Sequence, residues 1–312
     1  MTQTICGMDV SASTLDARIG RDGAWRRFEA TAEGLDALID FCRGHQVGLV
    51  VMEATGGYER QPFARLWAGG LPSAIVNPRA VRDFAKAVGF LEKTDRIDAG
   101  VIAWYAETRR IVPCRPASAT QQRLAALTTR LRQLTELRVG QTNQRRLVTD
   151  PDALASFEAI LGVIARETRA LEARIAELIS ADPMWIALDT AFRSIKGVAE
   201  RTVARLLAEL PEIGTLSNKA VSKLAGLAPI ASDSGKRTGK RPVRGGREGV
   251  RSILFVVAEL VRRYDPDFAA FHRRLSDAGK PKKLIRIALA HKLLVRLNAK
   301  ARDARTKCAA AT

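Results

Sequence analysis

Residues 47–58, Val-Gly-Leu-Val-Val-Met-Glu-Ala-Thr-Gly-Gly-Tyr, form the stretch of sequence that decides the fold. The run from Val47 to Met52 is short and almost wholly apolar, which is typical of a strand buried on both faces of a sheet. It ends at the acidic residue Glu53, and two glycines follow shortly after. The stretch therefore predicts a buried strand in an open sheet, with a carboxylate at its carboxyl end.

The flanking segments alternate between strand and helix patterns. A helix is expected between Thr31, a suitable N-cap, and Gly44, and two further helices flank the fifth predicted strand. Because strands alternate with helices, residues 1–110 are predicted to be an α/β domain whose first three strands form an antiparallel meander. Besides the central run, strands are expected at residues 4–10, 15–19, 25–28 and 73–76.

The rest of the chain has a helical pattern. Leucines recur at a 3-4-3 spacing from Leu124 to Leu134, and a second amphipathic stretch follows Pro151, so an antiparallel helical hairpin is expected. Two heptads leave open whether it packs on its own domain or serves as a dimerisation arm. A Gly-, Arg- and Lys-rich loop at 226–249 interrupts the last segment. The predicted domains are 1–116, 117–191 and 192–312.

Charge is distributed unevenly along these segments. The 312 residues include 51 Lys and Arg against 33 Asp and Glu, which gives a net charge of +18. Basic and acidic residues number 15 and 14 in 1–116, nine each in 117–191, and 27 and 10 in 192–312. This asymmetry indicates a polyanionic partner for the last segment, for which nucleic acid is the commonest candidate and an anionic membrane surface the main alternative.

Several classes of protein are disfavoured by composition. With 46% hydrophobic residues the chain can bury a core, and its apolar runs are far shorter than the roughly 20 residues of a membrane span. Because Asp9 lies where a signal peptide would be apolar, we expect a cytoplasmic protein that does not span a membrane. The four scattered cysteines and three histidines indicate neither a disulfide framework nor a zinc site.

Four acidic residues of the first domain are candidates for one site. Asp9 and Glu53 lie at predicted strand ends, where open α/β sheets form ligand sites. Asp95 and Asp98 are three residues apart, on one face of a helix, although they also suit the first turn after Thr94 as N-cap. Clustered carboxylates are ligands for Mg²⁺, and paired metals stabilise the attacking and leaving oxygens of a phosphodiester.

Six basic residues and several glycines lie between Asp233 and Arg247. We interpret this segment as a phosphate-binding loop, although such a run also suits a solvated face, and the absence of aromatic residues argues against base stacking. Ser234, judged from its Gly neighbour alone, is an ordinary turn residue. The helix–Gly197–helix segment is either a phosphate contact or a packed turn. The six basic residues are Lys236, Arg237, Lys240, Arg241, Arg244 and Arg247.

The order of several motifs resembles that of the DEDD transposases of insertion sequences, the family numbered one hundred and ten, which is related to the pilin-gene invertases. The sequence departs from that family at Ala199, where the family's turn usually has glycine. The matching motifs are Gly7-Met-Asp-Val-Ser11, Met52-Glu-Ala-Thr-Gly-Gly-Tyr58, Lys93-Thr-Asp-Arg-Ile-Asp-Ala99, Ser194-Ile-Lys-Gly-Val198, Lys223-Leu-Ala-Gly-Leu-Ala-Pro229, Asp233-Ser-Gly235 and Gly245-Gly-Arg247.

The resemblance implies a RuvC-like, ribonuclease-H-type domain with Asp9, Glu53, Asp95 and Asp98 as its metal-binding tetrad. It implies a helical arm, then a mainly α-helical transposase domain whose Ser234 forms a covalent phosphoserine with DNA. It further implies Mg²⁺ as cofactor, DNA and a noncoding guide RNA as partners, and a dimer or tetramer whose sites combine domains of two protomers.

Two alternatives remain open at this point. A nuclease resembling a Holliday-junction resolvase would use the four carboxylates with a metal-activated water and would not need Ser234. A defunct element protein would bind nucleic acid without cutting it. A covalent protein–DNA adduct distinguishes the transposase from the first alternative, and divalent-metal dependence distinguishes it from the second.

Overall fold

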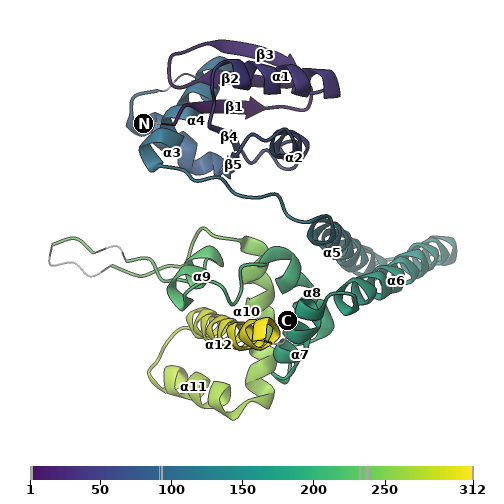
Figure 1. Ribbon diagram of the computed structural model, residues 1–312. Coiled ribbons are helices and arrows are strands. Elements are labelled where there is room, and N and C mark those ends of the chain that lie inside the picture. Colours follow the sequence, from purple (N-terminus) through teal and green to yellow (C-terminus); the bar gives the residue numbers. More distant parts are fainter. Residues whose placement is uncertain (1–2, 91, 93, 232, 236–238, 311–312) are drawn as a thin grey trace. The chain divides into compact units, whose positions relative to one another are not determined.

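The computed structural model describes residues 3–90, 92, 94–231, 233–235 and 239–310. It divides into two compact units, Met1–Ala117 and Ser118–Thr312. The first boundary lies one residue from the one predicted at 116/117. We call these unit 1 and unit 2 and describe each by itself (Figure 1).

Unit 1 contains a five-stranded mixed sheet, as the strand pattern predicts. The strand order is β3-β2-β1-β4-β5, in which β1 pairs antiparallel with β2 and parallel with β4. Pairing is antiparallel between β2 and β3 and parallel between β4 and β5. The strands are β1 (Ile5–Val10), β2 (Thr14–Ile19), β3 (Trp25–Glu29), β4 (Leu49–Glu53) and β5 (Ser73–Val76).

Helices cover both faces of this sheet, so the predicted α/β class is confirmed. Thr31 caps α1 by accepting a hydrogen bond from the Gly34 amide, 3.2 Å away. Side chains of α1 and α2 share a hydrophobic cluster with one face of the sheet, and side chains of α3 and α4 share another with the opposite face (Figure 1). The four helices are α1 (Ala32–Gly44), α2 (Arg60–Ala68), α3 (Pro78–Ala87) and α4 (Asp95–Arg109).

Unit 2 is helical in its described residues apart from the loops between helices. The hairpin predicted for 117–180 is present as its first two long helices, which pack against each other. The helices are α5 (Ala119–Arg145), α6 (Pro151–Ser180), α7 (Pro183–Arg193), α8 (Glu200–Glu209), α9 (Asn218–Leu224), α10 (Glu248–Tyr264), α11 (Pro266–Asp277) and α12 (Lys282–Ala310).

The predicted boundary at 191/192 does not separate compact units. Helix α7 runs across it, and α7 packs against α12 near the end of the chain. A single hydrophobic cluster joins Leu124 and Ile175 of the hairpin to Leu293 and Ala301 of α12. The hairpin therefore shares a core with the C-terminal helices, because its apolar stripe is buried by residues distant in sequence.

Gly197 lies between α7 and α8 with a φ of 99°, which favours glycine. A Cβ at this position would lie 3.0 Å from the backbone nitrogen of Val261 in α10. Close packing alone therefore explains this glycine. Within the described part of the chain, no helix combines the length and apolarity needed to cross a bilayer.

Candidate functional site

Two carboxylates lie at neighbouring strand ends of unit 1, as the sequence predicts. Glu53 is the last residue of β4, and Asp9 is next to last in β1. The parallel register pairs Met8 with Met52, so the following residues, Asp9 and Glu53, come side by side. Because side chains alternate along a strand, both acids project to the face opposite the buried Met8 and Met52, which is the face covered by α4.

Helix α4 approaches that face very closely at Gly7. A Cβ on Gly7 would lie 2.0 Å from the carbonyl oxygen of Ala99 and 2.5 Å from the amide nitrogen of Ala103. Only glycine therefore lets α4 lie against β1, two residues before Asp9. Thr94 caps the helix by accepting a hydrogen bond from the Ile97 amide, 3.3 Å away, which confirms the predicted cap.

Asp95 and Asp98 lie in the first turn of α4, at the Asp9 end of β1. Burial raises the pKa of Asp9 to about 6, and the negative charges of Asp98, Asp95 and Asp16 add to the rise. The structure thus brings Asp9, Asp95 and Asp98 within electrostatic reach of one another, and strand register adds Glu53. We call these four residues the acidic cluster.

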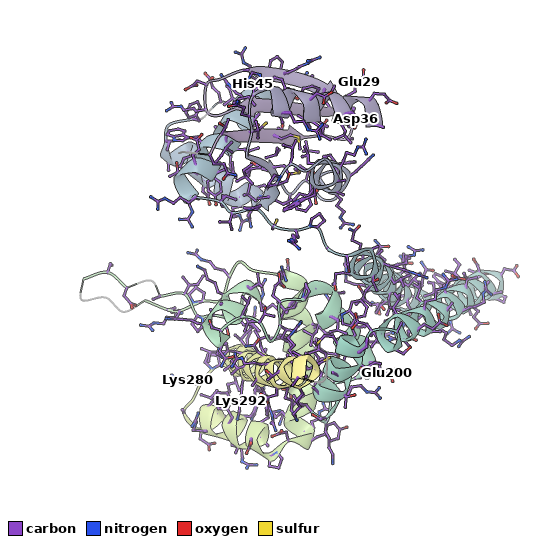
Figure 2. The ribbon with its side chains drawn as sticks, viewed as in Figure 1. Glu29, Asp36, His45, Glu200, Lys280 and Lys292 are labelled. Carbon is purple, nitrogen blue, oxygen red and sulfur yellow. The ribbon has the colours of Figure 1, made fainter. Side chains whose placement is uncertain are left out.

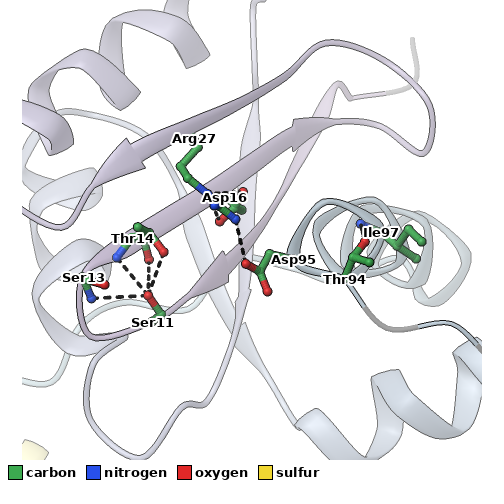
Figure 3. A network of polar contacts seen from close by, with 8 residues as sticks. All are labelled: Ser11, Ser13, Thr14, Asp16, Arg27, Thr94, Asp95 and Ile97. Carbon is green, nitrogen blue, oxygen red and sulfur yellow. Dashed lines mark hydrogen bonds and ion pairs between the residues drawn. The ribbon is translucent and has the colours of Figure 1, made fainter.

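Asp16 and Arg27 lie beside the acidic cluster, although the sequence alone does not predict them there. Asp16 faces Asp9 across the antiparallel β1–β2 pair, and Arg27 faces Asp16 across β2–β3. The Arg27 Nε donates to both carboxylate oxygens of Asp16 at 3.1 and 3.0 Å, and its Nη2 donates to Asp95 at 2.7 Å (Figure 3). In the sequence, acidic Asp16 lies between apolar Leu15 and Ala17. This alternation indicates that Asp16 lies on the opposite face of the strand from its two neighbours.

The chemistry of the acidic cluster fits a divalent metal ion. In the described ranges, no three Asp, Glu, His or Cys side chains are already arranged around a common metal position. The donors that converge on Asp9 are nevertheless all carboxylates, which hard cations such as Mg²⁺ prefer. Burial first, and then the neighbouring negative charges, make Asp9 costly to ionise, and a bound cation would lower that cost.

The loop after Glu53 is fixed by a buried acid, Glu59. One oxygen of Glu59 accepts hydrogen bonds from the Thr55 amide, the Thr55 hydroxyl and the Gly57 amide at 3.0, 3.0 and 2.8 Å. Burial alone would raise the pKa of Glu59, but these hydrogen bonds outweigh it and the pKa is lowered. Glu59 therefore stays ionised and shapes the turn that follows the β4 carboxylate. In the sequence, Glu59 lies two residues after the second glycine of the motif.

Ser234 lies in an exposed loop of unit 2. We define the serine loop as residues 230–242, of which 232 and 236–238 lie outside the described residues. Its arms are joined by a 3.0 Å hydrogen bond from the Ile230 amide to the Pro242 carbonyl. Asp233, next to the serine, accepts hydrogen bonds from the Gly239 amide and from Arg241 Nη2, each at 3.0 Å. The loop thus presents the Ser234 side chain to solvent.

Five of the six predicted phosphate contacts fall into three groups. Lys236 and Arg237 lie outside the described residues, whereas Lys240 and Arg244 are exposed. Arg241 is ion-paired with Asp233 at the base of the serine loop. The labelled Lys280 and Lys292 in Figure 2 are further basic side chains of unit 2.

Arg247 is engaged in a structural contact. Its guanidinium donates to the two carboxylate oxygens of Glu212 at 2.5 and 2.6 Å and to the Glu209 carbonyl at 2.9 Å. Burial alone would raise the pKa of Glu212, but the hydrogen bonds, led by Arg247, lower it. The structure therefore gives Arg247 the position of an anchor between the loop and the α8–α9 connection.

Comparison with known proteins gives two family matches. A transposase model, that of DEDD transposases of the IS110 type, matches residues 6–149 and so includes the whole acidic cluster. A second model, described as the transposase IS116/IS110/IS902 family, matches residues 189–273 and includes Ser234. Pilin gene-inverting proteins of Moraxella lacunata and Moraxella bovis are each 28% identical over 313 residues, which cover 94% of this chain and 94% of each relative.

Proposed function

We propose that this chain, which belongs to the IS110 family of transposases, cuts and rejoins DNA at the acidic cluster with the help of a divalent metal ion. The observation that carries the proposal is the meeting of Asp9 with Asp95 and Asp98 where α4 lies against β1. Burial and the nearby charges of Asp98 and Asp95 raise the pKa of Asp9, and a carboxylate perturbed in this way is characteristic of functional sites.

The architecture of unit 1 supports a RuvC-like, ribonuclease-H-type fold. The sheet is mixed, with three antiparallel strands followed by two parallel ones, and helices lie on both faces. Asp9 and Glu53 lie on the adjacent parallel strands at its centre. In open α/β sheets, ligands bind at the carboxyl ends of such strands.

Asp9, Glu53, Asp95 and Asp98 are the residues that would hold Mg²⁺. When bound, the ion supplies positive charge that stabilises the scissile phosphate as negative charge builds up on it. The carboxylates would hold the ion at this edge of the sheet, and α4 fixes two of them through its capped first turn. Glu59 keeps the loop after Glu53 in one conformation through its three hydrogen bonds.

Ser234 is the proposed nucleophile. Its hydroxyl oxygen forms a bond to phosphorus as the bond from phosphorus to one deoxyribose oxygen breaks, which leaves a phosphoserine. The hydroxyl proton leaves Ser234, and the departing deoxyribose oxygen takes up a proton. Exposure of Ser234 in a closed, Asp233-braced loop supports this assignment, since a nucleophile must reach a backbone phosphate.

A noncoding guide RNA is proposed to supply sequence recognition. If base pairing selects the DNA, the protein needs mainly contacts to phosphates, which positive charge provides. Lys240 in the serine loop and Arg244 just after it are exposed, in the segment that has nearly all of the excess positive charge.

Assembly into a dimer or tetramer is supported by the α5–α6 hairpin. The part of the hairpin near the turn between its helices exposes apolar side chains, with exposed fractions of 50% for Leu137, 90% for Leu147 and 46% for Val163. Leu137 belongs to α5, Val163 to α6 and Leu147 to the turn, and burial of such apolar side chains against a second copy would stabilise an assembly. Sedimentation of the full chain measures the state directly.

The test is a covalent adduct between protein and DNA. Wild-type chain, Mg²⁺, donor and target DNA, and RNA transcribed from the noncoding DNA beside the gene should give a DNA-linked protein that survives denaturation. Ser234→Ala should lose both the adduct and recombination, because it removes only the attacking hydroxyl. Ser252→Ala, an exposed serine of α10, is the matched control and should retain both.

The alternative functions appear as distinct outcomes. Metal-dependent cutting that persists in Ser234→Ala without an adduct would identify a nuclease in which water attacks. Binding without cutting, unaffected by Asp9→Asn, would identify a non-catalytic nucleic-acid-binding protein.

A further inference from the structure

We propose that Arg27, anchored on the buried Asp16, is a positioning residue that holds the Asp95 carboxylate in the orientation required for metal binding. The inference rests on the proposed function and extends it to two residues outside the acidic cluster. The juxtaposition of Asp16, Arg27 and Asp95 is visible in Figure 3.

The anchor of this arrangement is Asp16. Its side chain is only 2% exposed, and both of its oxygens are bound by the Arg27 Nε at 3.1 and 3.0 Å. A buried carboxylate is strongly stabilised by such a partner, since loss of the partner would leave an unpaired charge. The guanidinium is therefore held through Nε, while Nη2 remains available to donate to another acceptor.

The register of the β2–β3 hairpin determines the direction in which Nη2 of Arg27 points. Asp16 and Arg27 are directly opposite each other in the β2–β3 pair, and Asp9 is opposite Asp16 in β1–β2. The turn between β1 and β2 is closed by Ser11, whose hydroxyl accepts the Thr14 amide at 2.9 Å. A one-residue slip would move Asp16 to the other face of the sheet, so the turn and the pairing together set the position of Arg27.

Nη2 of Arg27 then donates to one oxygen of Asp95 at 2.7 Å. Asp95 is the first residue of α4, and its side chain is 55% exposed, so packing alone restrains it little. A hydrogen bond to one carboxylate oxygen orients the other, which is how partners of metal-binding carboxylates commonly act. Arg27 thereby restrains the Asp95 side chain, which packing at its exposed position does not.

A second contact ties the same turn of α4 to the same strand. The Arg96 guanidinium lies 5.5 Å from the centre of the Trp25 ring, and Trp25 is the first residue of β3. Farther along, the guanidinium of Arg21, between β2 and β3, lies 4.0 Å from the centre of the Trp104 ring of α4. The β2–β3 hairpin thus aligns α4 at several points, and Arg27 is the contact that reaches a member of the acidic cluster.

The experiment measures Mn²⁺ binding to the full chain by calorimetry, without DNA or RNA. Arg27→Met and Asp16→Asn should each weaken binding about tenfold, the lower end of the effect of removing a hydrogen bond from a metal-binding group. Arg65→Met is the matched control, because Arg65 forms an equally exposed ion pair with Asp36 in the same unit. It should bind Mn²⁺ as wild type does.

The paired variants separate positioning from charge. Arg27→Met removes a positive charge and Asp16→Asn removes a negative one, so a purely electrostatic effect would change affinity in opposite directions. Loss in both supports positioning. Unchanged or tighter binding in Arg27→Met, or full recovery in Arg27→Lys, would overturn it. If Asp9→Asn binds Mn²⁺ as wild type does, the proposed metal site itself fails, which is a different result.

Discussion

The acidic cluster and the serine loop are constructed in opposite ways. The cluster stands on two neighbouring strands and a capped helix, and at Gly7 the helix packs directly against the strand backbone. In the serine loop, every described residue from 231 to 241 is exposed or half-buried, and the hydrogen bonds of Asp233 join its two arms to each other. Rigid secondary structure therefore places the carboxylates, whereas a local side-chain brace shapes the loop around the proposed nucleophile.

The substitution with the largest expected effect on this comparison is Gly7→Ala, which should remove the rigid support of the acidic cluster. The new Cβ would meet the Ala99 carbonyl oxygen at 2.0 Å, so α4 must move away from β1 and take Asp95 and Asp98 with it. We expect the free energy of unfolding to fall by about 3 kcal/mol or more, the upper part of the range for overpacking, and metal binding to be lost. Thermal unfolding and Mn²⁺ calorimetry measure the two effects.

Gly44→Ala is the control for this substitution. Gly44 is the last residue of α1, and a Cβ there meets nothing within 4 Å. Its stability should be unchanged or higher by about 0.4–1 kcal/mol, because alanine restricts the unfolded chain. A Gly7→Ala chain that unfolds at the wild-type temperature would show that α4 is not held by this contact.

A smaller effect is expected when Asp9 is made neutral in the absence of metal. The pKa of Asp9 is about 6 in the folded chain against 3.8 ordinarily, so folding favours its protonated form. That stabilisation is complete below about pH 4 and is lost as pH rises through 6. In EDTA at pH 8, Asp9→Asn should therefore be more stable than wild type by about 1–2 kcal/mol, after allowance for solvent screening of a half-buried group.

The difference should shrink at pH 4.5, where wild-type Asp9 is protonated, and Asp22→Asn, at a 78% exposed position, should match wild type at both values. Urea unfolding at the two pH values makes the measurement. Addition of Mg²⁺ should stabilise wild type but not Asp9→Asn, since only a folded site binds the ion. An equal difference at both pH values would show that ionisation of Asp9 does not destabilise the folded chain.

Sequence reasoning succeeded where local pattern determines structure. The apolar run before Glu53 places a carboxylate at a strand end, and Thr94 caps the helix that begins with Asp95. It missed Asp16 and Arg27 because their meeting depends on cross-strand register, which the short turn at Ser11 sets and composition does not.

Long-range packing explains the other differences. The boundary between the second and third domains is predicted at 191/192 because the hairpin has its own helical pattern, but its apolar stripe shares a core with α12. Arg247 follows a run of basic residues, which predicts a phosphate contact, and its partner in the structure, Glu212, lies 35 residues earlier in the chain. Neither partner can be identified from periodicity along one segment.

The smallest expected change in stability comes from the exposed basic residues Lys240, in the serine loop, and Arg244, just after it. Lys240→Ala with Arg244→Ala removes two solvent-exposed charges, so stability should stay within about 0.5 kcal/mol of wild type. If both residues contact phosphates, the slope of log binding constant against log salt should become shallower by about 0.9 for each, measured on duplex DNA in EDTA.

Arg247→Ala should give the reverse result, because it removes the partner of the half-buried Glu212. Its stability should fall by about 1 kcal/mol or more, while the salt slope is unchanged. A double variant with the wild-type slope would mean that the loop's charge is not in contact with DNA, and a shallower slope in Arg247→Ala would return that residue to the binding surface. The serine loop would then be held by the same residue that binds the substrate, which would make loop and ligand interdependent in a way that the acidic cluster, fixed by its strands, is not.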